Sequence, residues 1–170
     1  MKRSKAAKTA GRRILGIDPG LAGTGWGIVA AGDGTIQYID HGIIQTKADR
    51  PRAERLFFIL ESFRSILDKY KPGEAAIEIL FFGKNVSSAI PVAEARGVIL
   101  AALAEHGLLV FELTPNSIKK GVVGIGKADK KQVQQMVCLI LGLNEIPKPD
   151  HAADALGAAI CAANLPASEG

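Results

Sequence analysis

The order of its apolar runs is the feature that most constrains how this chain folds. Three runs rich in strand-forming residues come first, and only short turns separate them, such as the GDG turn at 32–34. Apolar runs joined by tight glycine-containing turns form β-hairpins, so each of these strands should pair with its neighbour in sequence. We expect these strands at residues 14–18, 23–31 and 35–46.

Beyond these three strands, helical patterns alternate with short strands. Residues 52–70 carry apolar side chains at helical spacing, and the KPG that follows ends this helix. Two short apolar runs, at 74–80 and 108–113, indicate two more strands. The segment between them, 85–105, is expected to be a helix that either begins near Pro91 or kinks there. Beyond the proline it is apolar nearly all round, which favours burial in a core or in a subunit interface.

The last third of the chain is expected to be mostly helical. A short helix capped by Thr114 or Asn116 should come first, followed by a glycine-rich loop at 121–126 and by helices at 128–141 and 151–163.

The whole pattern predicts an α/β fold. Three hairpin-linked strands followed by β–α units give a mixed five-stranded sheet flanked by helices on both faces. A chain of 170 residues suits one domain with a sizeable core. We expect that domain at 14–165, between a basic disordered tail at 1–13 and a short C-terminal tail at 166–170.

Positive charge is concentrated in two places. Residues 1–13 hold six basic residues and no acid, so this tail accounts for all of the net charge of +4. A basic arm suits a polyanionic partner such as nucleic acid, although it equally suits mere solubility. A second basic cluster lies in the globular part and comprises Lys119, Lys120, Lys127, Lys130 and Lys131.

The composition argues against several classes of protein. With 48% hydrophobic and 22% charged residues, the chain is typical of a globular domain and not of a disordered one. No apolar run reaches the roughly 18 residues of a membrane span, so no membrane contact is expected. The two cysteines, Cys138 and Cys161, lie in apolar helical patterns without metal or disulfide spacing, which is typical of buried thiols in a reducing cytoplasm.

Several acids stand where they indicate a metal site. Asp18 ends the first apolar strand, and Glu78 lies within or at the end of the fourth. Carboxylates at such places are usually paired or bound to a metal ion. Near the start of the last helix, Asp154 shares a face with His151, three residues before it, and with Asp150, four before it. If this helix packs over the ends of neighbouring strands, these groups converge on a site whose hard oxygen ligands suit Mg²⁺ or Mn²⁺.

Each of these residues also fits an ordinary structural role. Asp18 alone could brace the Asp-Pro-Gly turn, and Glu78 could be half of a buried ion pair. Asp150 is best placed to cap the last helix, and His151 in isolation is typical of a surface residue in a first helical turn. The combination is therefore a stronger indication of a metal site than any single member.

Five motifs, taken in order, resemble those of one known family. GIDPGLAGTGWGIV, AIEILFFGKN, ARGVILAA, GVVGIGKADKKQV and HAADALGAAI occur in the order and spacing of RuvC, the bacterial Holliday-junction endonucleases, from about residue 14 to residue 163. The resemblance implies an RNase H-like fold and a homodimer. It implies metal-dependent cleavage of two opposing strands of a four-way DNA junction, in homologous recombination and DNA repair. It also implies the branch-migration complex of RuvA and RuvB as a partner.

The resemblance assigns catalytic roles to individual residues. The family's first aspartate corresponds to Asp18, its glutamate to Glu78 and its final acid to Asp154. The position three before the final acid is aspartate in many members and histidine in others, and here it is His151. These four residues are expected to hold two divalent ions, Mg²⁺ or Mn²⁺, which activate water and stabilise the leaving oxygen. Because an imidazole is a softer donor than a carboxylate, His151 should increase the preference for Mn²⁺.

The expected DNA-binding residues lie on two segments. One is the basic cluster, in which Lys119 and Lys130 correspond to family positions that contact DNA near the cut. The other is the loop after Glu78, where Phe81 corresponds to an aromatic residue that stacks on a base of the opened junction. Ile79 departs from the polar residue that often follows the family's glutamate. The full expected set is Phe81, Phe82, Lys84, Asn85, Lys119, Lys120, Lys127, Lys130 and Lys131.

Other functions fit parts of the sequence. GIDPGLAGTGWGIV is also typical of the first phosphate loop of actin-like and sugar-kinase ATPases, but those proteins need a second lobe for which this chain has no room. His151 leaves open a junction-binding protein of the same fold without cleavage activity. A relative that acts on RNA or on single strands is a further alternative.

Overall fold

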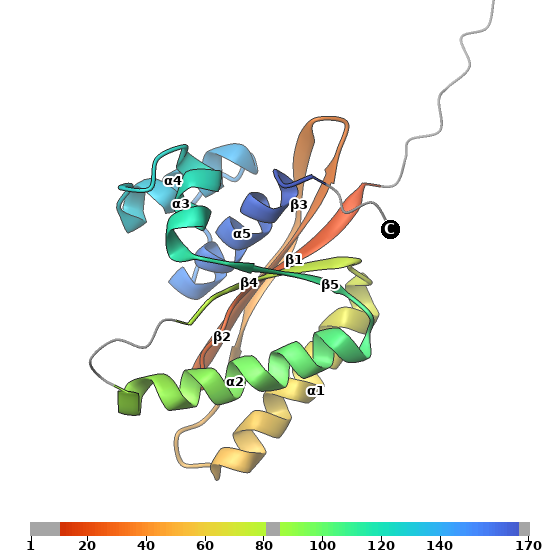
Figure 1. Ribbon diagram of the computed structural model, residues 1–170, viewed down its shortest axis with the longest axis vertical. Coiled ribbons are helices and arrows are strands. Elements are labelled where there is room, and N and C mark those ends of the chain that lie inside the picture. Colours follow the sequence, from red (N-terminus) through yellow and green to blue (C-terminus); the bar gives the residue numbers. More distant parts are fainter. Residues whose placement is uncertain (1–10, 81–85, 167–170) are drawn as a thin grey trace, which may run out of the picture.

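One mixed sheet of five strands forms the centre of the computed structural model (Figure 1). The structure describes residues 11–80 and 86–166, without the side chain of Val86. The first three strands form an antiparallel meander, and β4 and β5 run parallel to β1, in the order β3-β2-β1-β4-β5. The strands are β1 (Arg12–Asp18), β2 (Gly23–Gly32), β3 (Thr35–Gln45), β4 (Glu74–Glu78) and β5 (Leu109–Leu113). The expected α/β fold with a mixed five-stranded sheet is confirmed.

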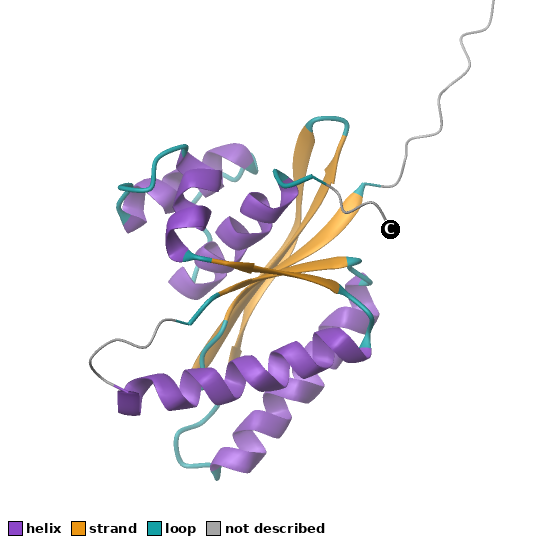
Figure 2. Cartoon of the chain, in the orientation of Figure 1, coloured by secondary structure: helices purple, strands orange, loops and turns teal. Residues whose placement is uncertain are grey.

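The helices cover both faces of the sheet (Figure 2). Because successive side chains of a strand point to opposite faces, β1 contributes to two separate cores. Leu15 and Ile17 are fully buried on one face, whereas Ile14 is fully buried on the other. The helices of the first face are α1 (Arg52–Tyr70) and α2 (Val86–Glu105), and those of the second are α3 (Pro115–Val123), α4 (Lys130–Ile140) and α5 (Asp150–Ala163).

Helix α5 lies directly on the strands because glycines face it. A Cβ atom at Gly16 would lie 1.8 Å from the carbonyl oxygen of Ala155, and one at Gly25 would lie 2.0 Å from the carbonyl oxygen of His151. Any side chain at these positions would push the helix away from the sheet. The glycines therefore set the distance between the first turn of α5 and the strands beneath it.

The N-terminal boundary of the domain differs from the expected one. Strand β1 begins at Arg12, and the guanidinium of Arg12 forms an ion pair with Glu74 of β4 at 2.7 Å. Arg12 and Arg13 therefore belong to the sheet and not to the basic tail. Residues 1–10, which make up most of that tail, lie outside the described residues.

The proline-containing helix and the one after it need separate comparison with the sequence expectation. Helix α2 begins at Val86 and includes Pro91, so of the two expected alternatives the start at the proline is excluded. Helix α3 continues to Val123, so the first part of the expected loop at 121–126 is helical. Gly124, with a φ of 88°, then ends α3 in a left-handed conformation that glycine adopts without steric cost.

Helix α2 has an unusually apolar composition. Its Ser87–Glu105 segment is the one described helix that has the length and composition of a membrane span, a property that core helices of soluble proteins share. Glu94 and Arg96 lie near its middle, where charged groups are costly in a bilayer, and they form ion pairs with Arg52 and Glu112. One side of α2 packs on α1, and the other side is exposed. This pattern is typical of a helix with one face in the core and one face available to a protein partner.

Candidate active site

Asp18 and Glu78 lie side by side at one end of the sheet, where β1 and β4 terminate. Strands β1 and β4 are parallel neighbours, and Ile17 pairs with Ile77 in the register. The next residue on each strand is the predicted acid, so both carboxylates stand at the carboxyl ends of adjacent strands. Parallel pairing thus brings together two residues that are far apart in the sequence.

The first turn of α5 brings His151 to the same end of the sheet. Asp18 pairs with Gly25 across β1 and β2, and the lack of a side chain at Gly25 lets the backbone of His151 approach. Nδ1 of His151 lies 2.7 Å from Oδ2 of Asp18, a hydrogen bond between residues 133 positions apart. Asp154 follows one helical turn later on the same face, as the spacing predicted. The four predicted catalytic residues therefore converge at one end of the sheet.

The three carboxylates of the site act on one another electrostatically. Burial raises the pKa of Glu78 to about 6, and the charges of Asp18 and Asp154 add to the effect. Burial also raises the pKa of Asp18, where the hydrogen bond from His151 opposes the shift and the charge of Asp154 adds to it. Carboxylates whose charges raise the pKa of a neighbouring carboxyl in this way form a site where a cation is favoured.

Lys130 supplies a positive charge at this place. Its Nζ lies 3.2 Å from Oδ2 of Asp154 and 3.3 Å from Oδ2 of Asp150. Partial burial lowers the pKa of Lys130, but the attraction of the two aspartates outweighs this and raises it. Asp150 does not cap α5 as expected: Pro149 occupies the N-cap position without a side-chain hydrogen bond, and the Asp150 carboxylate faces Lys130 instead.

A cavity of about 210 Å³ joins the acids to two of the predicted DNA-binding lysines. Glu78, Asp154, Lys119 and Lys130 line it together with Pro115, Ile118 and Val133. Three further lysines of the cluster are exposed and do not line this cavity; they are Lys120, Lys127 and Lys131. The remaining predicted DNA contacts, Phe81, Phe82, Lys84 and Asn85, lie outside the described residues.

The donor set fits divalent ions by its chemistry. Three carboxylates and one imidazole are the ligands that Mg²⁺ and Mn²⁺ accept in proteins, and the charge of Asp154 raises the pKa of both Asp18 and Glu78. In the described part of the chain, no three acidic, histidine or cysteine side chains are gathered closely enough to form a metal cluster as they stand. As the side chains stand, Asp18 is hydrogen-bonded to His151, and Asp154 is paired with Lys130.

A second cleft, of about 430 Å³, opens beside His151. It is bounded by the turn from Pro19 to Gly23, by Arg52 and Arg55 of α1, and by Pro91 and Val92 of α2. Sequence analysis missed the two arginines as site residues. The signal available was the basic stretch KADRPRAER at 47–55, but nothing local placed it next to the acids.

Comparisons with known proteins agree with this geometry. The family model described as crossover junction endodeoxyribonuclease RuvC matches residues 14–162, a range that contains all four converging residues. A crossover junction endodeoxyribonuclease RuvC from Treponema denticola is 50% identical over 165 residues, which cover 97% of this chain and 93% of that relative.

Solved structures show a similar fold. A structure of Thermus thermophilus RuvC is 34% identical, with a TM-score of 0.81, over 88% of this chain and 92% of that one. T. thermophilus RuvC in complex with a Holliday junction substrate is 31% identical, with a TM-score of 0.80, over 88% of this chain and 91% of that one.

Proposed function

This chain belongs to the RuvC family of crossover junction endodeoxyribonucleases. We propose that it resolves Holliday junctions by hydrolysing DNA phosphodiester bonds, with Asp18, Glu78, His151 and Asp154 as its catalytic residues. Metal dependence follows from membership of the family. The observation that carries the assignment of the site is the convergence of these four side chains at one end of the sheet. They lie next to lysines whose positive charge can bind a phosphate group. Junction DNA as the substrate is supported by the complex of the T. thermophilus relative.

The four side chains have different roles in the proposed reaction. Asp18, Glu78 and Asp154 would hold two divalent ions, with the imidazole of His151 as a further ligand. When bound, Mg²⁺ or Mn²⁺ supplies activation of the attacking water and charge stabilisation of the departing 3′-oxygen. The hydrogen bond between His151 and Asp18 orients both side chains, because each side chain limits the rotation of the other. The partial burial of Glu78 and Asp18 keeps these charges in a medium that screens them less than bulk water does.

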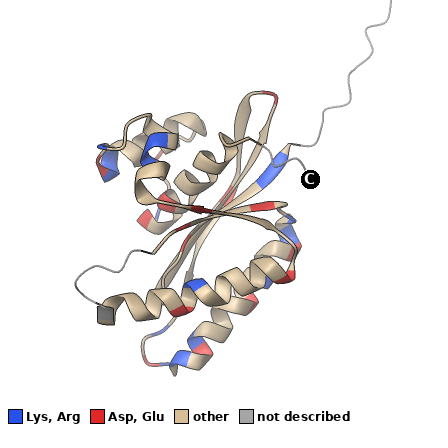
Figure 3. Ribbon diagram, in the orientation of Figure 1, with Lys and Arg blue, Asp and Glu red and all other residues tan. Residues whose placement is uncertain are grey.

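The lysines complete the site on the phosphate side. Lys119 and Lys130 face the same cavity as Glu78 and Asp154, so a scissile phosphate at the acids would lie beside two ammonium groups. Lys120, Lys127 and Lys131 extend the positive surface and add salt-dependent affinity. Figure 3 shows basic residues on α3 and α4 near this end of the molecule. The loop with Phe81, Phe82, Lys84 and Asn85 contributes base stacking and phosphate contacts in the same proposal.

A two-fold homodimer accounts for paired cuts. A four-way junction has two equivalent strands, and two active sites related by one axis nick them symmetrically. The exposed side of α2 presents Ile90, Gly97, Ala101 and Ala104 at helical spacing. These small and apolar residues suit close packing against the same helix of a second copy. RuvA and RuvB, as branch-migration partners, and a cytoplasmic, nucleoid-associated location belong to the proposal through the family alone.

Cleavage of an end-labelled mobile four-way junction tests the function. In Mg²⁺ or Mn²⁺ we expect paired symmetric nicks, and Asp18→Asn should abolish them while it leaves junction binding intact. Junction binding without cleavage in either metal would overturn the nuclease assignment. Equal cleavage of a linear duplex would overturn the selectivity for junctions.

A further inference from the structure

The cleft beside His151 leads from the active site to the start of α1. The turn after β3 lies against the turn that follows Asp18, since the amide of Thr46 donates to the carbonyl oxygen of Ala22 at 3.1 Å. Gln45 pairs with Gly23 in the sheet just before this point. Residues at the start of α1 are thereby held at the same end of the sheet as the catalytic acids (Figure 1).

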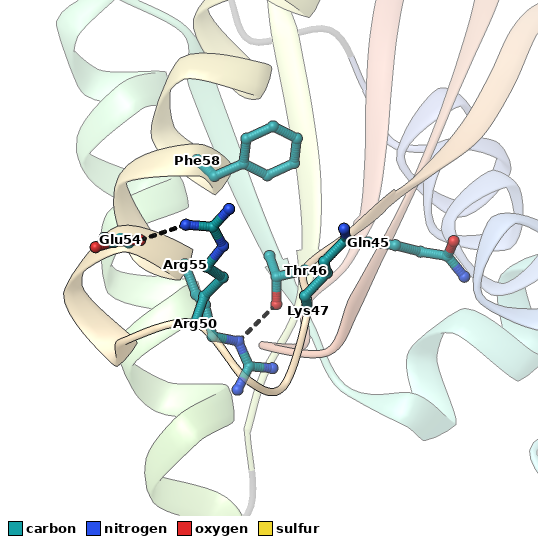
Figure 4. A pocket seen from close by; sticks show the side chains of 7 residues that line it. All are labelled: Gln45, Thr46, Lys47, Arg50, Glu54, Arg55 and Phe58. Carbon is teal, nitrogen blue, oxygen red and sulfur yellow. Dashed lines mark hydrogen bonds and ion pairs between the residues drawn. The ribbon is translucent and has the colours of Figure 1, made fainter.

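A neighbouring pocket continues this surface. It has a volume of about 330 Å³ and is lined by Gln45, Thr46, Lys47, Arg50, Glu54, Arg55 and Phe58 (Figure 4). Arg55 lines both this pocket and the cleft beside His151. The two hollows therefore adjoin at Arg55, which lies between His151 in one lining and Lys47 in the other.

Arg55 is held in place by a chain of hydrogen bonds. Its Nε donates to Oγ1 of Thr46 at 2.8 Å (Figure 4). That hydroxyl donates to the carbonyl oxygen of Leu21 at 2.5 Å. This chain fixes the guanidinium between α1 and the turn after Asp18. Its two terminal nitrogens have no partner among the described residues. A guanidinium held by one bond, with its other donors unused, is prepared to bind an anion through two parallel hydrogen bonds.

The charges of this segment separate into paired and unpaired groups. Arg50 lies 3.6 Å from Glu54, and Arg52 lies 3.2 Å from Glu94. Lys47 and Arg55 have no carboxylate within ion-pair distance in the described parts of the chain. Arg55 is also half-buried, so its charge is less well solvated than that of an exposed arginine. The unneutralised charge of Arg55 thus lies where the two hollows meet, and that of Lys47 lines one of them.

We propose that Arg55 and Lys47 bind a backbone phosphate of the junction strand that passes the active site, away from the scissile phosphate. A DNA strand carries a phosphate at every nucleotide. A strand cut beside Asp18 and His151 must place further phosphates along the surface that leads away, and this path carries the free cations. Arg55 and Lys47 are positioning residues that set the register of the strand. The inference rests on the proposed junction cleavage.

Salt dependence of junction binding is the first test. Arg55→Gln and Lys47→Gln are compared with wild type in Ca²⁺, with Arg64→Gln as the control. Arg64 lies on the same helix, bonded to Glu61 and Glu105, so its replacement removes the same charge away from the cleft. Each cleft variant should bind roughly tenfold more weakly at low salt. Loss of one phosphate contact should reduce the slope of log K against log salt by about 0.9. Arg64→Gln should keep the wild-type slope.

Single methylphosphonate substitutions identify the phosphate. Junctions with one uncharged linkage at each position near the cut should show a position that weakens the wild type but not Arg55→Gln. Arg55→Lys keeps the charge and should keep both the salt slope and the sensitivity to that position. If Arg55 only braces Thr46, Arg55→Lys should be as impaired as Arg55→Gln, with a wild-type slope in both. Lys47→Gln provides an independent check, because the ammonium of Lys47 has no hydrogen-bond or ion-pair partner among the described residues.

The outcomes separate this inference from the assigned function. A wild type that neither binds nor cuts junctions would overturn the proposed function. A wild type that cuts, with cleft variants that keep its slope and its methylphosphonate profile, would overturn the inference alone. Variants with normal junction binding but lost binding to an acidic protein would also overturn it, and would assign the cleft to that protein.

Discussion

At the scale of single residues, the active site keeps charges that the folded chain would be more stable without. The pKa of Glu78 is raised from 4.5 to about 6, through burial first and then through Asp18 and Asp154. A carboxyl whose pKa is higher in the folded state stabilises the fold below its unfolded pKa, and this contribution is lost as pH rises through the folded pKa. At pH 8, ionised Glu78 is therefore a cost to stability.

Removal of this charge should stabilise the metal-free protein. We expect Glu78→Gln to unfold with a free energy about 1 kcal/mol higher than wild type at pH 8 in a chelator, after a discount for solvent screening. The difference should vanish near pH 4, where the glutamate is protonated. Denaturant titrations at both pH values measure it, with the exposed Glu145→Gln as the control. A variant less stable than wild type at pH 8 would contradict the electrostatic account.

His151 should set the choice of metal. Its Nδ1 is engaged with Asp18, which leaves Nε2 to serve as a ligand. Replacing the imidazole by a carboxylate gives a harder and more negative donor set, so His151→Asp should lower the ratio of the cleavage rates in Mn²⁺ and Mg²⁺. Single-turnover rates in each metal measure this ratio. The same ratio in both proteins would mean that the imidazole does not contact the ions.

At the scale of elements, helix α4 positions the ammonium group of Lys130 through its cap. Asp129 accepts from the amide of Gln132 at 2.8 Å, and the side chain of Gln132 accepts from the amide of Asp129 at 2.9 Å. This capping box fixes the first turn of α4, where Lys130 is the first residue. The direction of the Lys130 side chain toward Asp154 thus depends on a local motif.

Loss of the cap should therefore reduce both stability and cleavage. We expect Asp129→Ala to lower the free energy of unfolding by about 1 kcal/mol, because a backbone donor loses its partner. Cleavage should fall several-fold as Lys130 loses its fixed position. Asp129→Ser retains a capping hydroxyl and should preserve most of both properties. Full cleavage by an Asp129→Ala protein with the expected loss of stability would show that the cap does not position Lys130.

At the scale of the whole molecule, α2 links the fold to the proposed dimer. The exposed residues Gly97 and Ala101 leave room for a close neighbour, and a Cβ at Gly97 would meet nothing within 4 Å. Glu94 and Arg96 are occupied by ion pairs within the chain. The available surface of this helix is therefore mainly apolar.

A charge on this surface should separate the dimer. Ala101→Glu introduces a good helix former at an exposed position, so the monomer should fold normally, while two glutamates would face each other across the axis. Sedimentation should show a shift from dimer to monomer, and junction nicks should become unpaired. Ala53→Glu, exposed on α1, is the control. A dimer that persists in Ala101→Glu would place the interface elsewhere.

The sequence by itself determined the class of fold and the identity of the acids. The strands and the order of the helices follow from apolar periodicity and from turn residues, which act over a few positions. Asp18, Glu78 and Asp154 were candidates because carboxylates in apolar surroundings need a cation, and the family resemblance assigned their catalytic roles, which stay predictions. The sequence expectation failed where a local signal competed with a tertiary contact: Asp150 has a typical capping residue type, but its carboxylate pairs with Lys130 instead.

Only the tertiary structure decided how these residues meet. The hydrogen bond between His151 and Asp18 joins residues 133 positions apart in the sequence. It can form because Gly16 and Gly25 let α5 lie on the sheet. No local pattern shows that these glycines face the helix, since this depends on the packing of a distant segment. Arg55 reaches the active-site cleft for the same reason, through contacts between two turns. Short-range patterns thus select the elements, whereas the close approach of backbones and the pairing of charges are settled only when those elements pack together.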